Sequence, residues 1–153
     1  MIYREMPKEG LPVTQARDLR TSEDIFLDVD VVVVGSGTGG AVIAHELAAA
    51  GKSVVILEAG RYIPSSQFTE DMAWALENLY KDVGTQTNTI GDMVVLEGHC
   101  VGGSSVISAA IAARVPEFVL KSWAKDHDLP GFLPDTFNKY YEKVEKRLHV
   151  HLN

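Results

Sequence analysis

A glycine-rich loop placed directly after a run of valines is the feature that most restricts what this chain can fold into. The run covers residues 29–34, and β-branched residues with little polar alternation are typical of a parallel strand buried on both faces. The loop covers residues 35–40, and the stretch after it has helical spacing up to Gly51, a residue type that often ends a helix. A second apolar run over residues 53–57 predicts another strand. This order predicts an α/β fold with a Rossmann-type βαβ core.

The glycine loop has the G-x-G-x-x-G spacing of a dinucleotide-binding motif. Gly35 would allow the tight turn, Gly37 would let the backbone approach a pyrophosphate, and Gly40 would let the helix pack closely on the strand. The free N–H groups and the positive end of the helix dipole would face the phosphates. The cofactor-binding residues predicted here are Gly35, Ser36, Gly37, Thr38, Gly39 and Gly40.

Glu58 stands directly after the second predicted strand. A carboxylate there accepts hydrogen bonds from ribose hydroxyls and would repel a 2′-phosphate, which disfavours NADP. The motif alone does not separate FAD from NAD, because both present the same ADP half. A glycine-rich turn in a fold that binds nothing is the alternative, and the strand, helix and carboxylate in their required places count against it.

Composition and charge narrow the class of protein. The 153 residues carry a net charge of −7, which argues against a nucleic-acid partner or an anionic membrane surface. Cys100 is the single cysteine, so no intramolecular disulfide can form and a reducing compartment is expected. No apolar run is long enough to span a bilayer, and residues 1–28 contain no apolar stretch of the signal-peptide kind. These features predict a cytoplasmic protein without a membrane span.

The second half of the chain predicts a hairpin among several helices. Helical spacing predicts a helix over residues 68–80, and a Thr-rich stretch with a Gly-Asp turn predicts a β-hairpin over residues 85–97. A helix of small side chains is expected after the next glycine loop, reaching Ala113. Pro116 and Pro134 would each stand at the start of a further helix. Two parallel strands and a hairpin leave open sheet edges, so the fold is expected to be incomplete on its own.

A second glycine-bearing loop covers residues 98–105 (GHCVGGSS). Gly102 and Gly103 remove side chains where a flat ring must approach the backbone. Ser104 and Ser105 offer hydroxyls and exposed N–H groups at another expected helix start. The alternative is a tight loop needed only for packing; the first motif favours flavin contact.

At these residues the sequence resembles the glucose–methanol–choline (GMC) oxidoreductases, which are FAD enzymes that oxidise alcohols. The segments that carry the likeness are residues 31–51, 57–61 (LEAGR) and 98–105. The last is the most specific, because in that family a Gly-Gly-Ser-Ser loop starts a helix running under the flavin. Residues 114–116 and the spacing of Val119, Leu120 and Trp123 resemble the long-chain alcohol oxidase and cholesterol oxidase side of the family. The likeness covers residues 29–150, the N-terminal part of a typical member.

The resemblance implies FAD as the cofactor. Besides the first loop, the residues it places at FAD are Glu58, Ala59, Gly60, Gly98, Gly102, Gly103, Ser104, Ser105 and Ser108. Several members attach the flavin covalently through a histidine where this chain has Ile107, so the FAD is expected to be non-covalent. Many members have Asn where this chain has Ser108, whose hydroxyl has a shorter reach.

In the family the catalytic histidine lies near the C-terminus of a longer chain, and no residue here matches it. The expected activity is therefore alcohol oxidation only together with the missing C-terminal part, as a second chain or as the rest of a longer one. An NAD-dependent dehydrogenase piece and a non-catalytic dinucleotide-binding subunit are the alternatives. No metal site is predicted, since His149 and His151 lack a partner at ligand spacing.

Three parts are expected along the chain. Residues 1–28 predict an N-terminal arm, because two prolines and many charges leave no periodicity. Residues 29–115 would form the N-terminal portion of an FAD-binding domain. Residues 116–153 would form a helical segment that starts a substrate domain.

Overall fold

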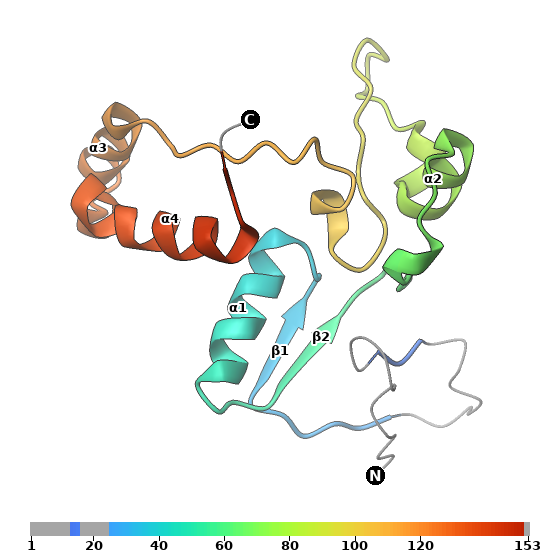
Figure 1. The fold of residues 1–153 in the computed structure, drawn as a ribbon, viewed down its shortest axis with the longest axis horizontal. Helices are drawn as coiled ribbons and strands as arrows, with labels where there is room; N and C mark the ends of the chain where they lie inside the picture. The colour runs from blue at the N-terminus through green and yellow to red at the C-terminus, as the bar shows by residue number, and fades with distance from the viewer. Residues whose placement is uncertain (1–12, 16–24, 152–153) are drawn as a thin grey trace. The chain divides into compact units, whose positions relative to one another are not determined.

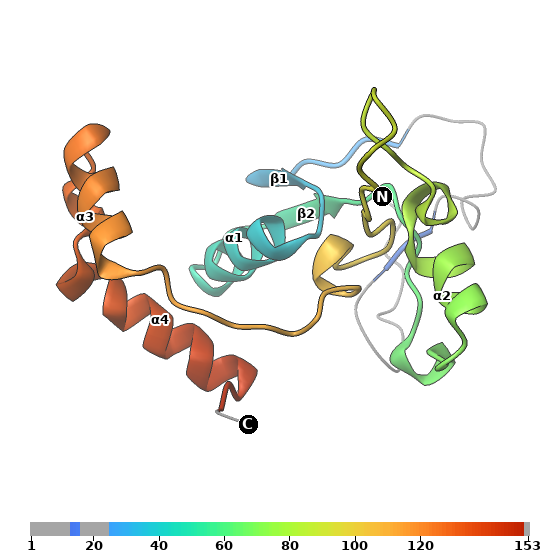
Figure 2. The ribbon, with the colours of Figure 1, turned by 90° about the horizontal axis from the view of Figure 1, so that it is seen from above.

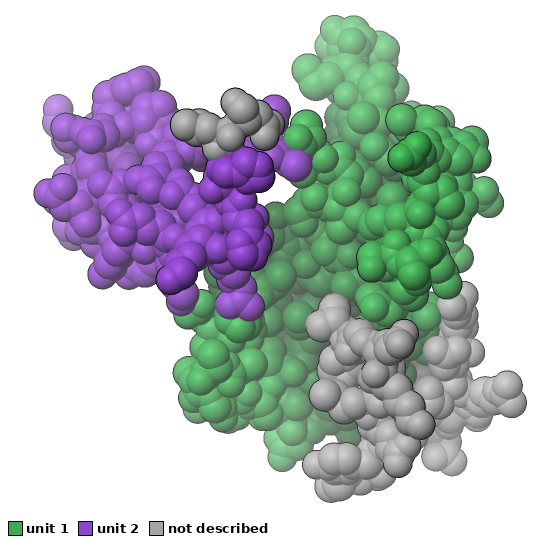
Figure 3. All heavy atoms as spheres, in the orientation of Figure 1, with its two compact units in different colours: residues 1–109 green, residues 110–153 purple. Residues whose placement is uncertain are grey.

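The computed structural model describes residues 13–15 and 25–151. The chain divides into two compact units, unit 1 with residues 1–109 and unit 2 with residues 110–153 (Figure 3). Most of the expected N-terminal arm falls outside the described residues. The expected domain boundary between residues 115 and 116 stays a prediction.

Unit 1 is built on a parallel strand pair joined by a helix. Strand β1 (Val31–Val34) leads through the first glycine loop into α1 (Thr38–Ala49), and the chain returns as β2 (Val54–Leu57). The strands pair from Val31↔Val54 to Val34↔Leu57. Figures 1 and 2 both show α1 running alongside the strand pair. The predicted order of strand, loop, helix and strand is confirmed, and the fold is mixed α/β.

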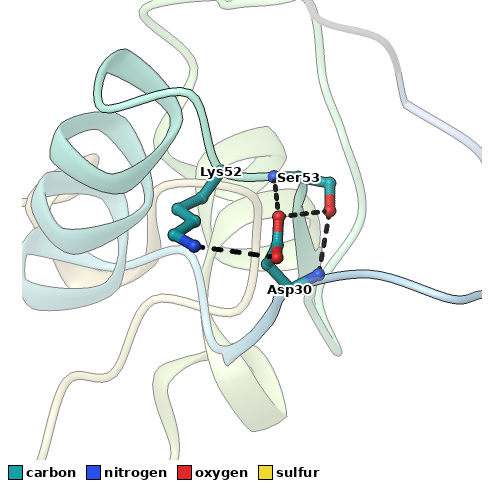
Figure 4. A network of polar contacts seen from close by, with 3 residues as sticks. All are labelled: Asp30, Lys52 and Ser53. Atoms are coloured by element: carbon teal, nitrogen blue, oxygen red, sulfur yellow. Dashed lines mark hydrogen bonds and ion pairs between the residues drawn. The ribbon is translucent and has the colours of Figure 1, made fainter.

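A polar network fixes the register of this pair at the strands' starting ends (Figure 4). The Ser53 N–H and hydroxyl donate to the Asp30 carboxylate at 2.8 and 2.9 Å, and the Asp30 N–H donates back to Ser53 Oγ at 2.8 Å. Lys52 Nζ lies 3.8 Å from the same carboxylate. The bonds from Ser53 hold the pKa of Asp30 below its usual value. Because these residues directly precede β1 and β2, a slip of either strand would break the network.

The predicted helix over residues 68–80 is shorter in the structure, where α2 spans Met72–Leu79. Asp71 supplies the N-cap, and its carboxylate accepts a 2.8 Å bond from the Ala73 N–H. A capping side chain satisfies a first-turn N–H group and so favours a helix start at this point. The residues before it form only a short 3₁₀ turn, η2 (Ser65–Gln67).

The β-hairpin predicted over residues 85–97 is reduced to a single antiparallel bridge, Thr87↔Val94. Backbone bonds run from the Val95 N–H to Gln86 O and from the Asn88 N–H to Met93 O. No strand is assigned between residues 85 and 97, all of which the structure describes. The apolar side chains of residues 93–96 are exposed, so the ladder has no buried face to stabilise it.

The helix of small side chains expected up to Ala113 is wrong. The second glycine loop ends in one 3₁₀ turn, η4 (Gly103–Ser105), and residues 109–116 form neither helix nor strand. Short helices depend on packing an apolar face against the rest of the protein. The large apolar side chain of this segment is Ile111, which is 85% exposed, so forming a helix here would bury little apolar surface.

Unit 2 contains the two helices predicted after the prolines, α3 (Glu117–Asp126) and α4 (Pro134–Leu148). Leu120 of α3 is 1% exposed and forms the centre of this unit. An aromatic cluster lies between the helices, made by Trp123, Phe132, Phe137 and Tyr141 with ring centroids 5.0 to 6.1 Å apart in successive pairs.

The segment before α3 is fastened to α4. Both Nε and a terminal nitrogen of Arg114 donate to the Glu145 carboxylate at 2.6 Å. The Val115 N–H donates to the Tyr141 hydroxyl at 3.1 Å. The hydrogen bonds and charge of this pair raise the pKa of Arg114 and lower the pKa of Glu145.

Candidate functional site

The first glycine loop packs α1 tightly on β1. The Gly35 N–H donates to Leu57 O at 2.8 Å, which ties the start of the loop to the end of β2. A Cβ added at Gly40 would lie 2.0 Å from Gly35 O and 3.2 Å from a methyl of Val33. No side chain fits there, so Gly40 permits the close helix–strand approach that the motif requires.

The N-terminus of α1 is open. Gly37 is its N-cap, no side chain caps the first turn, and no acidic residue occupies that turn. A Cβ added at Gly37 or Gly39 would meet no protein atom within 4 Å. The first N–H groups of an α-helix have no partner within the helix and carry its positive end. This end of α1 can therefore accept an anion such as a pyrophosphate.

Glu58, at the end of β2, is joined to the first loop through Ser36. The Ser36 N–H and hydroxyl donate to Glu58 Oε2 at 2.8 and 2.7 Å, and the Gly60 N–H donates to Oε1 at 2.8 Å. Burial opposes ionisation of this carboxyl, but the hydrogen bonds outweigh it and hold its pKa below the usual value. A carboxylate has about four acceptor positions, and the Ser36 and Gly60 bonds take three of them.

The second glycine loop meets the first. The Gly102 N–H donates to Ser36 Oγ at 2.8 Å, and a Cβ added at Gly103 would lie 3.2 Å from the Gly37 Cα. Both glycines have positive φ, +99° and +58°, so the loop turns back on itself there. Two segments that the sequence assigned separately to one cofactor thus lie in backbone contact within unit 1.

Other predicted site residues pack the second loop against the chain. A Cβ added at Gly60 would lie 2.3 Å from Cys100 N, and one at Gly98 would lie 2.5 Å from Gly103 O. The Gly98 N–H donates to Ser104 Oγ at 3.0 Å. These contacts give the glycines at positions 60 and 98 a packing role, whether or not they also touch a cofactor.

The remaining predicted residues lie at the edge of this arrangement. The Ser105 hydroxyl donates to Gly102 O, and Ala59 and Ser108 are exposed. Ser108 follows η4 on the segment where the expected helix is absent. Ile107, at the place of covalent attachment in other members, is half-buried.

Two further features of unit 1 lie beside this arrangement. Cys100 is buried next to the loops, and burial together with the negative charge of Glu58 raises the pKa of its thiol. A small cavity of about 190 Å³ lies next to the LEAGR segment and is lined by Arg61, Tyr62, Ile63, Gln67, Trp74 and Asn78. The residues that line this cavity follow no regular spacing that would predict it from the sequence.

The described part of the chain holds no cluster of three or more His, Cys, Asp or Glu side chains placed to bind a metal ion. None of its helices combines the length and the apolar character that crossing a bilayer demands.

Comparison with known proteins assigns the family. Residues 76–153, just over half of the chain, match the GMC oxidoreductase model, and residues 30–93 match an FAD binding domain. A GMC-type oxidoreductase of Sinorhizobium fredii, itself uncharacterised, is 35% identical over 86% of this chain and 26% of its own length. The long-chain-alcohol oxidase FAO3 of Arabidopsis thaliana is 38% identical over 86% of this chain and 18% of its own length. A cholesterol oxidase of Mycobacterium tuberculosis is 31% identical over 80% of this chain and 22% of its own length.

The chain therefore spans about a quarter or less of the length of these relatives. The FAD-binding match covers β1, α1 and β2, and the GMC match covers the second glycine loop and unit 2. The resemblance read from the glycine loops is confirmed, as is its long-chain-alcohol and cholesterol oxidase side. This chain belongs to the GMC oxidoreductases, a family of FAD-dependent oxidoreductases.

Proposed function

We propose that this chain is the Rossmann-type, FAD-binding N-terminal portion of a GMC enzyme that oxidises an alcohol. The observation that carries the proposal is the junction of the two glycine loops at the open N-terminus of α1, with Glu58 beside them. An ADP group needs a phosphate site and a ribose acceptor, and the open end of α1 and the Glu58 carboxylate would supply them.

The residues fit the parts of FAD as follows. First-turn N–H groups of α1, at Thr38, Gly39 and Gly40, would hold the pyrophosphate, and the open space at Gly37 would admit it. Glu58 would accept bonds from the ribose. Bound FAD supplies the acceptor for the hydride that leaves the alcohol.

The flavin end is proposed at the second loop. Gly102 and Gly103 would let the ring approach the backbone, with Ser104, Ser105 and Ser108 offering hydroxyls. The remaining residues proposed at the cofactor are Gly35, Ala59, Gly60 and Gly98, with Ser36 bonded to Glu58 and Gly102 behind them. Ile107 cannot form the covalent link of a histidine, so the cofactor is proposed to be dissociable.

The rest of the enzyme would complete the site. Val32, Val34 and Leu57 expose more than half of their surface on the strand pair, an apolar area that further polypeptide would cover. We propose that the partner is the C-terminal part of the same enzyme, as a second chain or as the rest of a longer one, and that it brings the catalytic histidine. An alcohol is proposed as the substrate because five relatives are named long-chain-alcohol oxidase or cholesterol oxidase.

The test is a titration of the purified chain with FAD and, separately, with NAD. Binding of FAD but not NAD, followed by release of free FAD on denaturation, is the expected result. Failure of FAD to bind, with NAD binding instead, would contradict the proposal.

Gly37→Ala sharpens this test, because the added methyl should meet no other part of the protein. Gly37 has φ −62°, and an added Cβ would meet only open space. If a pyrophosphate occupies that space, the methyl should weaken FAD binding by about tenfold or more. Gly131→Ala, which also adds a methyl into open space, is the matched control and should bind FAD normally. Equal affinities of the two variants would argue against a cofactor at α1.

Adding the C-terminal part distinguishes an enzyme from a non-catalytic subunit. The chain alone should oxidise no alcohol, and the two parts together should. Normal FAD binding with no activity in the assembled protein would favour the non-catalytic subunit.

A further inference from the structure

Ser36 is buried and its polar groups are engaged within the protein. Its residue surface is 6% exposed. Its N–H and its hydroxyl proton both go to Glu58 Oε2, and its oxygen accepts the Gly102 N–H. A serine has one backbone donor and one hydroxyl donor, so neither is left for a ligand.

The bonds of Ser36 join three separate segments. These are the first glycine loop, the end of β2 at Glu58, and the second glycine loop at Gly102. The two loops also pack closely at the neighbouring glycines, because a Cβ added at Gly103 would lie 3.2 Å from the Gly37 Cα. A change in the Ser36 bonds would therefore alter both the position of Glu58 and the distance between the loops.

We infer that Ser36 is a positioning residue that sets the spacing of the two glycine loops, by holding the Glu58 carboxylate and the Gly102 backbone, and is not a ligand of the cofactor. The inference rests on the proposed function in one respect: the loops it spaces are those proposed to hold FAD. The Ser36 hydroxyl donates to a charged carboxylate and accepts a backbone N–H, and both bonds are part-buried, so their loss should be measurable.

The ionisation state of Glu58 provides an independent readout. The Ser36 and Gly60 bonds lower the pKa of Glu58, whereas burial raises it. The other titratable groups on the segments around Glu58 are Arg61, His99 and Cys100, whose thiol has a raised pKa. The titration is therefore followed at the Glu58 carboxyl itself, by its own NMR signal.

The test compares Ser36→Ala with Ser53→Ala. The Ser53 hydroxyl also donates to a carboxylate and accepts a backbone N–H, but at the far ends of the strands. Ser36→Ala should speed hydrogen exchange of the Gly102 amide by about tenfold and move the Glu58 carboxyl titration to higher pH. Ser53→Ala should change neither. Ser36→Thr keeps the hydroxyl and should restore the protection of Gly102.

FAD titration of the same variants completes the test. Ser36→Ala should weaken FAD binding by about tenfold, and Ser53→Ala should leave it unchanged. Unaltered Gly102 exchange and Glu58 titration in a folded Ser36→Ala variant would overturn the inference, whether or not FAD binds. So would altered exchange with normal FAD affinity. A wild-type chain that binds no FAD would instead count against the proposed function, while exchange and titration still decide the Ser36 contacts.

Discussion

The backbone N–H of Gly102 donates a 2.8 Å hydrogen bond to the hydroxyl of Ser36, 66 positions earlier in the chain. That bond connects two loops which the sequence presents as separate glycine motifs. Since the Ser36 hydroxyl also donates to Glu58, one network of hydrogen bonds joins the carboxylate and both loops. The candidate site is therefore held together by the protein itself before any cofactor is considered.

Gly40→Ala should destabilise the chain, because the new methyl would lie 2.0 Å from Gly35 O. Relief requires α1 to move away from β1, and overpacking of this kind costs about 1–3 kcal/mol. The free energy of unfolding in urea is the measurement. The neighbouring Gly39→Ala is the control: its methyl meets no atom within 4 Å, so stability should stay equal or rise by up to about 1 kcal/mol. Equal losses in both variants would contradict the packing role of Gly40.

Leu120→Ala should destabilise unit 2, since this side chain is 1% exposed. Removing a buried leucine and leaving a cavity costs about 2–5 kcal/mol. Phe118→Ala, on the same helix but 75% exposed, should change the free energy of unfolding by only about 0.5 kcal/mol. Chemical denaturation followed by tryptophan fluorescence reports the loss, because Trp123 lies in the same unit. A larger effect at Phe118 would show that this surface is covered in solution.

The sequence predicts the β1–α1–β2 unit well because its signals are local. A β-branched run, a glycine loop and Gly51 each act within a few residues of where they stand. The Pro116 and Pro134 helix starts are local signals of the same kind. The glycine positions of the first loop carry their packing requirements in the motif itself, and Gly40 illustrates this.

The features that the sequence predicted wrongly or did not predict depend on contacts that no local pattern encodes. Alanine-rich residues up to Ala113 have high helix propensity, yet Ile111 packs against nothing that would stabilise a helix. The contact between Ser36 and Gly102 spans loops whose separation in space is set by tertiary structure. A serine at the second position of the glycine motif gives no sign of which backbone it will bind.

Arg114→Lys should loosen the segment before α3. Arg114 donates through two nitrogens to the Glu145 carboxylate, and a lysine ammonium cannot reproduce that two-point geometry. The melting temperature should fall, and hydrogen exchange at Val115, whose N–H binds Tyr141, should quicken. Lys121→Arg, in an exposed pair with Glu117, is the control and should leave both unchanged. Unchanged exchange at Val115 would show that the Tyr141 contact holds the segment without the ion pair.

The free energy of unfolding should fall in acid, in part because the Glu58 carboxylate becomes protonated. Its folded pKa lies below the ordinary value, because the Gly60 and Ser36 bonds outweigh the effect of burial. A carboxyl with a lowered folded pKa contributes stability above its unfolded pKa and loses it as pH falls through the folded pKa. Asp30 and Glu145 also have lowered pKa values and lose stability over the same acid range. The pH dependence of the wild-type free energy of unfolding therefore does not isolate the contribution of Glu58.

Glu58→Gln separates the contribution of Glu58 from the others. At neutral pH the variant should be less stable by about 1 kcal/mol, a value reduced for solvent screening of a partly exposed group. Below the folded pKa of Glu58 the wild-type carboxyl is itself neutral, so the two proteins should converge in stability. Urea denaturation of both proteins from neutral pH to about pH 3 measures the difference, with Glu77→Gln on the exposed side of α2 as the control. A difference that stays constant over this range would show that the Glu58 bonds do not depend on its charge.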